Sequence, residues 1–290
     1  MKYLLLLTAA LLAACPSAAV DDDDDTTAAP EPKFGAAFIG GDRPVPVTAP
    51  PGYDGLTPAP LVILLHGRGA NPDLVEFIFG WRDVADELGA FLVVPESTTD
   101  AGGSPAWNWP LDPTEADDVG YVQLLVDTML EQWAIDPDRV YLAGHSNGGF
   151  MAYRMACDAP ERFAAILPYA GLSPVEDEDD CQPSASVSVL ITHGTEDGSN
   201  PYAPTDGRLG VEDLAPLWAE RAGCAAGYSE EDPRDITDAV DGAEARVWAW
   251  GDCDERRSVE LWAIQGGGHN SPFSDGGSEQ TLEWLLERRR

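Results

Sequence analysis

The chain has 290 residues, of which 44% are apolar and nine are Trp, so it is long enough to bury one sizeable hydrophobic core. Its 51 acidic and 17 basic residues give a formal net charge of −34. A surface this acidic argues against nucleic acids and anionic membranes as binding partners, because both would be repelled.

The N-terminal segment predicts export. Lys2 precedes an apolar run at 4–14 that is too short for a stable membrane span, which is typical of a signal peptide over 1–14. The run ends in Leu-Ala-Ala-Cys, which fits a bacterial lipobox, so we expect Cys15 to be lipidated and to become the mature N-terminus. An ordinary signal peptide that is cut nearby is the alternative.

An acidic run at 21–25 and the Thr, Ala and Pro residues after it cannot bury apolar surface, so 15–33 is expected to be a disordered tether. The remaining residues, 34–290, are interpreted as one domain without internal repeats. We therefore expect a cell-envelope lipoprotein or a secreted protein, monomeric, which meets a membrane only through a lipid anchor at Cys15.

Short apolar runs alternate with segments of helical periodicity along the rest of the chain. The runs predict strands that are buried on both faces, at 61–65, 91–95, 139–143, 164–168, 187–192 and 259–264. The periodic segments predict helices at 81–88, 118–133, 150–157 and 278–290. This alternation predicts an α/β fold, a mostly parallel central sheet with helices on both faces. Residues 45–48, flanked by prolines, predict an added edge strand, and 174–186 an exposed loop.

The most informative motif is Gly-His-Ser-Asn-Gly-Gly at 144–149, between a predicted strand and a predicted helix. In that context G-x-S-x-G is typical of a nucleophile elbow, a sharp turn that presents a serine at the carboxyl edge of a sheet. Gly144 and Gly148 lack a Cβ, so the strand and the helix can approach closely. We therefore predict Ser146 as a nucleophile.

A serine hydroxyl needs a base, and the base needs an orienting acid. Among four histidines, His269 follows the last predicted strand on a glycine-rich loop, which suits the Ser–acid–His order of this fold. The acid should then lie between Ser146 and His269. Asp197 directly follows a predicted strand and is the preferred candidate; its competitors are Glu196 and Asp206.

Two further groups of residues complete the predicted site. The backbone N–H groups of Asn147 and Arg68 are expected to stabilise the oxyanion, since they follow strands at the same edge. Trp107 and Trp109 lie on a loop rich in Gly and Pro, where they either contact the substrate or cap the core. Asp117 and Asp118 are interpreted as the start of the next helix, and His66 as a structural residue that holds its loop.

Four cysteines remain besides Cys15, and an even number in an exported chain predicts two disulfides. Three pairings are possible, and we predict the two that are local in sequence, Cys157–Cys181 and Cys224–Cys253. No Cys-x-x-Cys pair occurs, so no zinc site is expected. No organic cofactor is expected either.

Taken together, the motifs resemble those of a known family. They are Leu-His-Gly at 65–67, Trp-Asn-Trp at 107–109, Asp-Asp-Val at 117–119, the elbow, His-Gly-Thr-Glu-Asp at 193–197 and Gly-Gly-Gly-His at 266–269. The chain resembles secreted polyhydroxybutyrate depolymerase-like esterases, which are related to feruloyl and acetylxylan esterases. The resemblance implies an α/β-hydrolase fold and a triad of Ser146, Asp197 and His269, and it supports both disulfides.

The sequence thus predicts an exported serine carboxylester hydrolase that works through an acyl-enzyme. Its substrate would be a small or polymeric ester, either a polyhydroxyalkanoate or a feruloyl or acetylxylan ester. Two alternatives are a serine peptidase on the same fold and a non-catalytic surface lipoprotein that serves as a binding module.

Overall fold

The computed structural model describes residues 31–173, 181, 183–205, 208–254 and 257–290. One compact unit runs from Glu31 to Arg290. The predicted signal peptide, Cys15 and nearly all of the acidic tether lie outside the described residues, as do Asp206 and much of the loop predicted at 174–186. No helix in the described part of the chain is long and apolar enough to cross a membrane.

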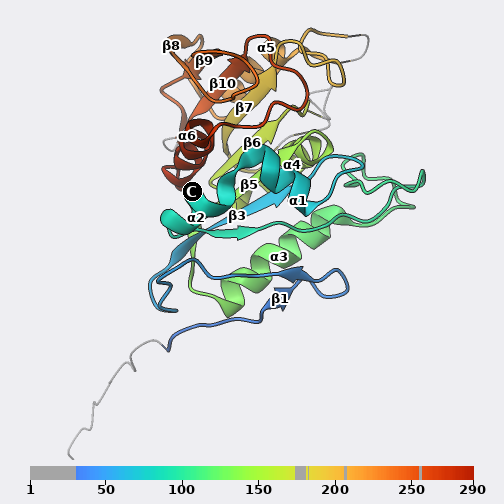
Figure 1. Cartoon of the computed structure of the whole chain (residues 1–290), viewed down its shortest axis with the longest axis vertical. Helices are drawn as coiled ribbons and strands as arrows, with labels where there is room; N and C mark the ends of the chain where they lie inside the picture. Colours follow the sequence, from blue (N-terminus) through green and yellow to red (C-terminus); the bar gives the residue numbers. More distant parts are fainter. Residues whose placement is uncertain (1–30, 174–180, 182, 206–207, 255–256) are drawn as a thin grey trace, which may run out of the picture. The chain divides into compact units, whose positions relative to one another are not determined.

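An eight-stranded sheet forms the centre of the unit, in the order β4-β3-β5-β6-β7-β10-β9-β8 (Figure 1). The first six strands in that order pair in parallel: β4 (Phe91–Val93), β3 (Ala59–Leu65), β5 (Ile135–His145), β6 (Ala165–Tyr169), β7 (Ser188–Gly194) and β10 (Val259–Ile264). All six coincide with predicted strands, and the mostly parallel sheet is the architecture predicted.

Two antiparallel strands extend the sheet beyond β10, and neither was predicted. They are β9 (Ala245–Trp250) and β8 (Ser229–Arg234). Strand β8 has the sequence Ser-Glu-Glu-Asp-Pro-Arg, and almost all of its residues are exposed. It therefore lacks the apolar pattern from which a strand is predicted. Its charges and Pro233 suit the edge of a sheet, because they discourage pairing with a further strand.

The strand predicted at 45–48 does not join the edge of the central sheet, so this prediction was wrong. Strand β2 (Val45–Pro46) pairs antiparallel with β1 (Phe38–Ile39) in a separate two-stranded sheet. Pro44 and Pro46 have no N–H group, so this segment has few donors to offer to a long ladder. Val45 and Val47 are nevertheless buried against the main core.

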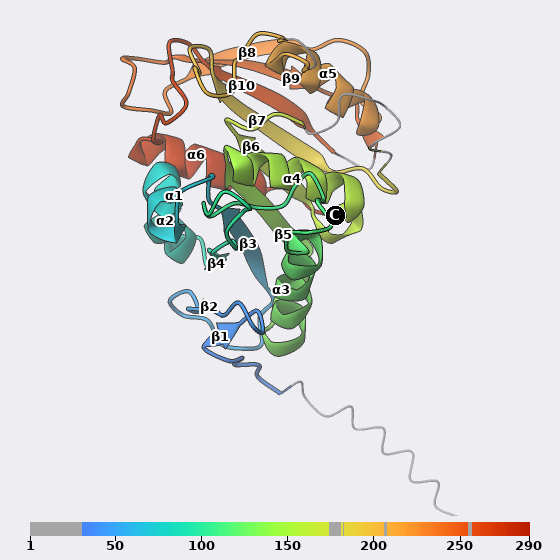
Figure 2. The ribbon, with the colours of Figure 1, turned by 90° about the vertical axis from the view of Figure 1, so that its right-hand side faces the viewer.

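In the described residues, six α-helices cover the two faces of the sheet (Figure 2). One face carries α3 (Asp118–Gln132), α4 (Asn147–Asp158) and α5 (Val211–Arg221), and the other carries α1 (Pro72–Phe79), α2 (Trp81–Glu87) and α6 (Asp275–Leu286). Successive residues of β3 alternate between the two cores: Leu61 and Ile63 face the first, Val62 and Leu64 the second. This two-sided burial explains the continuous apolar runs of the parallel strands.

The predicted helices are present with shifted ends, and α1 and α5 were not predicted. Helix α6 begins at Asp275 rather than at 278, because the Ser274 side chain caps it by accepting from the Gly277 N–H, and it ends at Leu286. Helix α5 contains Pro216, which interrupts the helical signal in the sequence.

Two disulfides close the structure in the pairing that was predicted. Cys157–Cys181 joins the end of α4 to the segment before β7, and Cys224–Cys253 joins the residues after α5 to those after β9. Both lie on the half of the chain that follows Ser146.

Candidate active site

The strand–turn–helix around Ser146 forms the sharp turn that the motif predicts. Strand β5 ends at His145, α4 begins at Asn147, and Ser146 between them has φ 53° and ψ −116°. A positive φ is strained for a residue with a side chain, so the turn must be held by its surroundings. A Cβ on Gly144 would lie 2.3 Å from the Gly148 carbonyl O, and a Cβ on Gly148 would lie 2.3 Å from the Leu65 carbonyl O. Both positions therefore require glycine.

Three predicted side chains meet at the carboxyl edge of the sheet. Ser146 follows β5, Asp197 follows β7 and His269 follows β10, and the carboxyl ends of parallel strands lie at one edge. His269 Nε2 is 2.9 Å from Ser146 Oγ, and His269 Nδ1 is 2.7 Å from Asp197 Oδ2. A charged carboxylate only accepts, which assigns the proton to Nδ1 and leaves Nε2 to accept from the serine hydroxyl.

The Asp197 carboxylate is buried and fully hydrogen-bonded. Its Oδ1 accepts from the backbone N–H groups of Ser199 and Asn200, both at 2.8 Å. Its Oδ2 accepts from His269 and lies 3.2 Å from Nε2 of the buried His193. Burial alone would raise the pKa of Asp197, but the hydrogen bonds from His193 and His269 outweigh it and hold that pKa well below its usual value.

Of the two competing acids, Glu196 has an exposed side chain and Asp206 lies outside the described residues. The carboxylate that reaches His269 is that of Asp197.

His145, which precedes the serine, is directed at the loop that carries His269. Its Nε2 is 2.8 Å from the His269 carbonyl O, and the two imidazole rings are 4.9 Å apart. Burial lowers the pKa of His145 to about 4, with a smaller lowering from the nearby His269 and His193. No motif in the sequence indicates this contact, because it joins residues 124 positions apart.

The loop after β3 packs directly against the elbow. A Cβ on Gly67 would lie 3.3 Å from Ser146 Cβ, so Gly67 lets this loop approach the serine. The Gly67 carbonyl accepts from the Ala70 N–H at 3.1 Å and lies 2.8 Å from His66 Nδ1. The Gly67 carbonyl and the Arg68 N–H belong to one trans peptide, so they point to opposite sides of it. The two donors that hold the Gly67 carbonyl therefore direct the Arg68 N–H away from themselves. His66 Nε2 accepts from the Ser97 N–H at 3.0 Å, so His66 holds its loop as expected.

Asn147 has two functions in this geometry. Its backbone N–H begins α4, where a helix provides no acceptor of its own. Its side chain holds the aromatic loop, residues 107–109: Oδ1 accepts from the Trp107 N–H at 2.7 Å, and Nδ2 donates to the Trp107 carbonyl at 3.2 Å.

The Arg68 side chain is exposed and pairs with Asp100 at 2.7 Å.

The two tryptophans separate into a core residue and a surface residue. Trp107 is 1% exposed, and its indole N–H donates to the His66 carbonyl at 2.9 Å. It therefore caps the core, and the expectation that it contacts the substrate is wrong, because it has no surface to offer. Trp109 is half-buried and stacks on Phe150 with ring centroids 4.8 Å apart, one turn along α4 from Ser146. It stays a candidate contact.

Asp117 and Asp118 begin α3, as predicted, but Asp118 also has a role that the sequence did not indicate. Asp117 caps the helix by accepting from the Gly120 N–H at 2.8 Å. The buried Asp118 pairs with Arg43 at 2.5 Å and accepts from the Asn108 N–H at 2.6 Å. It thereby anchors the aromatic loop at its centre.

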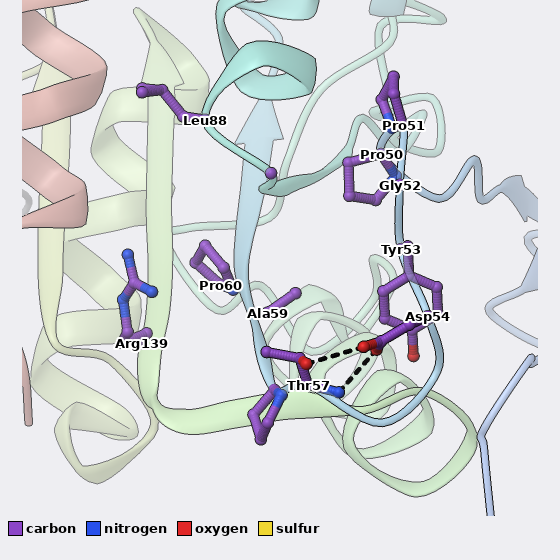
Figure 3. Close-up of a pocket in the computed structure, with 12 residues that line it drawn as sticks. Pro50, Pro51, Gly52, Tyr53, Asp54, Thr57, Ala59, Pro60, Leu88 and Arg139 are labelled. Atoms are coloured by element: carbon purple, nitrogen blue, oxygen red, sulfur yellow. Dashed lines mark hydrogen bonds between the residues drawn. The ribbon is translucent and has the colours of Figure 1, made fainter.

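A pocket lies away from these residues. The pocket lies beside the start of β3 and the residues before β4, at the amino edge of the sheet (Figure 3). Its volume is about 340 Å³. Its lining is rich in proline, and the carboxylate of Asp54 is already bonded to Thr57. Its lining contains no His, Cys or Ser. Within the described ranges, no group of three His, Cys, Asp or Glu residues could hold a metal ion.

Several known proteins are similar in sequence to this chain. "Putative esterase NocK" of Nocardia uniformis subsp. tsuyamanensis is 29% identical over 226 residues, which cover 73% of this chain and 65% of that protein. "Poly(3-hydroxybutyrate) depolymerase" of Ralstonia pickettii is 28% identical over 227 residues, which cover 74% of this chain and 44% of that protein. The chain spans less than two thirds of the length of either relative.

Solved structures show the same fold at lower identity. An acetyl xylan esterase from Aspergillus awamori superposes with a TM-score of 0.63 at 16% identity, over 84% of this chain and 94% of that one. Esterase PE8 gives a TM-score of 0.53 at 22% identity, over 87% and 99%. The fold is that of an α/β-hydrolase.

The family described as "Esterase PHB depolymerase" matches residues 46–211, more than half of the chain, including Ser146 and Asp197. This confirms the resemblance drawn from the motifs. The chain belongs to the esterase PHB depolymerase family.

Proposed function

We propose that the protein is a serine carboxylester hydrolase in which Ser146, His269 and Asp197 form the catalytic triad. The single observation that supports this assignment most is the continuous line of hydrogen bonds from Ser146 Oγ through His269 to Asp197 Oδ2, at 2.9 and 2.7 Å. Nucleophile, base and orienting acid are the three parts that acyl transfer requires.

In the proposed acylation step, Ser146 Oγ attacks the ester carbonyl carbon while its proton passes to His269 Nε2. The oxyanion accepts from the backbone N–H groups of Asn147 and Arg68. The bond to the leaving alcohol then breaks, and His269 returns the proton to the alkoxide. Asp197 stays charged, since its low pKa keeps it a carboxylate, and it stabilises the imidazolium.

Deacylation repeats the sequence with water in place of Ser146. His269 takes a proton from water, the hydroxide attacks the acyl carbon, and the bond to Ser146 Oγ breaks. His269 returns the proton to Ser146, and the carboxylic acid leaves. Trp109, beside Phe150 at the start of α4, is the proposed substrate contact.

The mechanism is tested by hydrolysis of p-nitrophenyl acetate and butyrate. We expect Ser146→Ala to lose at least about 10³-fold in kcat, because the nucleophile is removed. Ser229→Ala on the exposed strand β8 is the matched control and should behave as the wild type. Undiminished turnover in Ser146→Ala would refute the assignment.

For the natural substrate we propose a polyhydroxyalkanoate or a feruloyl or acetyl ester of a plant cell-wall polysaccharide. The names of the relatives support this range, since they include a poly(3-hydroxybutyrate) depolymerase and a bifunctional acetylxylan esterase/xylanase. Product release from hydroxybutyrate oligomers and from feruloylated arabinoxylan, measured side by side, separates the two classes. Release from neither would contradict both.

We also propose that the protein is exported, lipid-anchored at Cys15 and monomeric. The two disulfides support export, because such bonds persist in oxidising compartments. The wild type should partition with membranes, whereas Cys15→Ser should appear in the soluble fraction. Membrane association of the variant would contradict the anchor, and a dimer mass in light scattering would contradict the monomer.

A further inference from the structure

The loop that carries His269 would be a poor platform for a base if it stood alone. It contains three consecutive glycines at 266–268, and Gly266 has φ 75°. Glycine has the widest backbone freedom of any residue, so this loop needs external anchors to hold an imidazole in one place. Proton transfer depends on such placement, since a misplacement of about 1 Å can lower a rate about 100-fold.

Most anchors of this loop lie on either side of His269. On one side, the Gly267 carbonyl accepts from the Glu196 N–H at 2.9 Å. On the other, the Ser271 carbonyl accepts from the Tyr169 hydroxyl at 2.5 Å, and Ser271 Oγ accepts from the Gly268 N–H at 3.1 Å. These bonds fix the ends of the loop but leave the His269 peptide itself untouched.

In the described part of the chain, the side chain that bonds the His269 main chain is His145. A carbonyl oxygen only accepts, so the 2.8 Å contact assigns a proton to His145 Nε2. The His145 ring is 4% exposed and packs at 5.4 Å against Tyr169. Burial lowers its pKa to about 4, so the ring is neutral near pH 7 and has one Nε2 proton to donate.

His145 is also the residue directly before Ser146, at the end of β5. One rigid strand end therefore carries the nucleophile and, through the neighbouring side chain, holds the backbone of the residue that deprotonates it. A donor on any other element would fix the loop without fixing it to the serine.

On the basis of the proposed function, we propose that His145 is a positioning residue: its Nε2–H, bonded to the His269 carbonyl, sets the distance between the His269 imidazole and Ser146 Oγ. Its contact is with the main-chain carbonyl of His269 and not with the imidazole nitrogens or with Ser146 Oγ. Its removal should therefore lower kcat and leave KM almost unchanged, because binding does not depend on it.

The test compares two variants at the same position. His145→Leu fills the site without a donor, whereas His145→Gln places an amide N–H close to the position of Nε2. With p-nitrophenyl butyrate we expect the Leu variant to lose about 10- to 100-fold in kcat with KM within about threefold of the wild type. The Gln variant should recover kcat to within about threefold of the wild type.

Tyr141→Phe is the matched control for losing one buried hydrogen bond on β5. The Tyr141 hydroxyl donates to the Arg288 carbonyl at 2.6 Å, and Tyr141 lies five residues before Ser146 in the chain. This variant should unfold at a lower temperature yet keep its kcat. If His145→Leu does not fold, His145→Asn replaces it, since its shorter amide reaches only the position of Nδ1 and should lose kcat as the Leu variant would.

The outcomes separate this inference from the function on which it rests. A folded Leu variant with the kcat of the wild type would overturn the positioning role, as would a folded Gln variant no faster than the Leu or Asn variant. Either result leaves the proposed triad intact as long as Ser146→Ala is inactive. Turnover that persists in Ser146→Ala would instead remove the proposed function itself.

Discussion

Burial of His145 makes the stability of this protein sensitive to acid in a window that one substitution can isolate. The pKa of His145 falls from an ordinary value of 6.5 to about 4 in the folded protein. Between these values the unfolded chain binds a proton that the folded protein does not, so acid favours unfolding. The stabilising contribution is complete above pH 6.5 and is lost as the pH falls toward 4.

The magnitude follows from the size of the shift. Each pKa unit corresponds to about 1.4 kcal/mol, so a change from pH 7 to pH 4.5 should remove about 2 kcal/mol from the free energy of unfolding through His145 alone. His66 also has a pKa lowered by burial, but it is present in both proteins and cancels from their difference. Asp197, whose pKa is lowered from 3.8, acts mainly below this window.

Urea unfolding of the wild type and of His145→Gln at pH 7 and pH 4.5 measures this difference. The wild type should lose about 2 kcal/mol more than the variant over that range, because glutamine does not titrate. Equal losses in the two proteins would mean that His145 titrates alike in the folded and unfolded states and that its burial does not lower its pKa.

Three further substitutions test other parts of the structure. Asp197→Asn should lower kcat about 10²- to 10⁴-fold in steady-state assays, because an amide N–H in place of Oδ2 favours the wrong tautomer of His269; a loss below tenfold would contradict the role of Asp197. Gly148→Ala should destabilise the protein by about 1–3 kcal/mol and abolish turnover, because its Cβ would lie 2.3 Å from the Leu65 carbonyl O. An unchanged midpoint of urea unfolding would count against that close approach. The double variant Cys224→Ser with Cys253→Ser removes a disulfide with a sequence separation of 29 residues, and it should lower the free energy of unfolding by about 3–4 kcal/mol in the chain-entropy model. An unchanged free energy of unfolding would mean that the disulfide does not restrict the unfolded chain.

The parts of this fold that could be predicted are those whose physical cause is local. Strands buried on both faces read as apolar runs, which is why β3 and β5 were visible, and the elbow was visible because its glycines are needed for close approach. The order of Ser146, Asp197 and His269, each directly after a strand, then placed all three at one sheet edge.

What could not be predicted depends on contacts between distant segments. Strand β8 has no apolar residue and exists because β9 pairs with it. The burial of Trp107 follows from its clamp by Asn147, and the direction of His145 from a loop that follows much later in the chain. A tryptophan on a glycine-rich loop looks the same in sequence whether it faces solvent or core.

Covalent labelling measures whether His269 activates Ser146. A fluorophosphonate should label the wild type once per chain, on the peptide that contains Ser146, and should leave Ser146→Ala unlabelled. Labelling of His269→Ala should be slower by about 10³-fold or more, because the base is missing. Labelling on a different residue would mean that Ser146 is not the nucleophile, and an equal rate in His269→Ala would mean that His269 does not activate it.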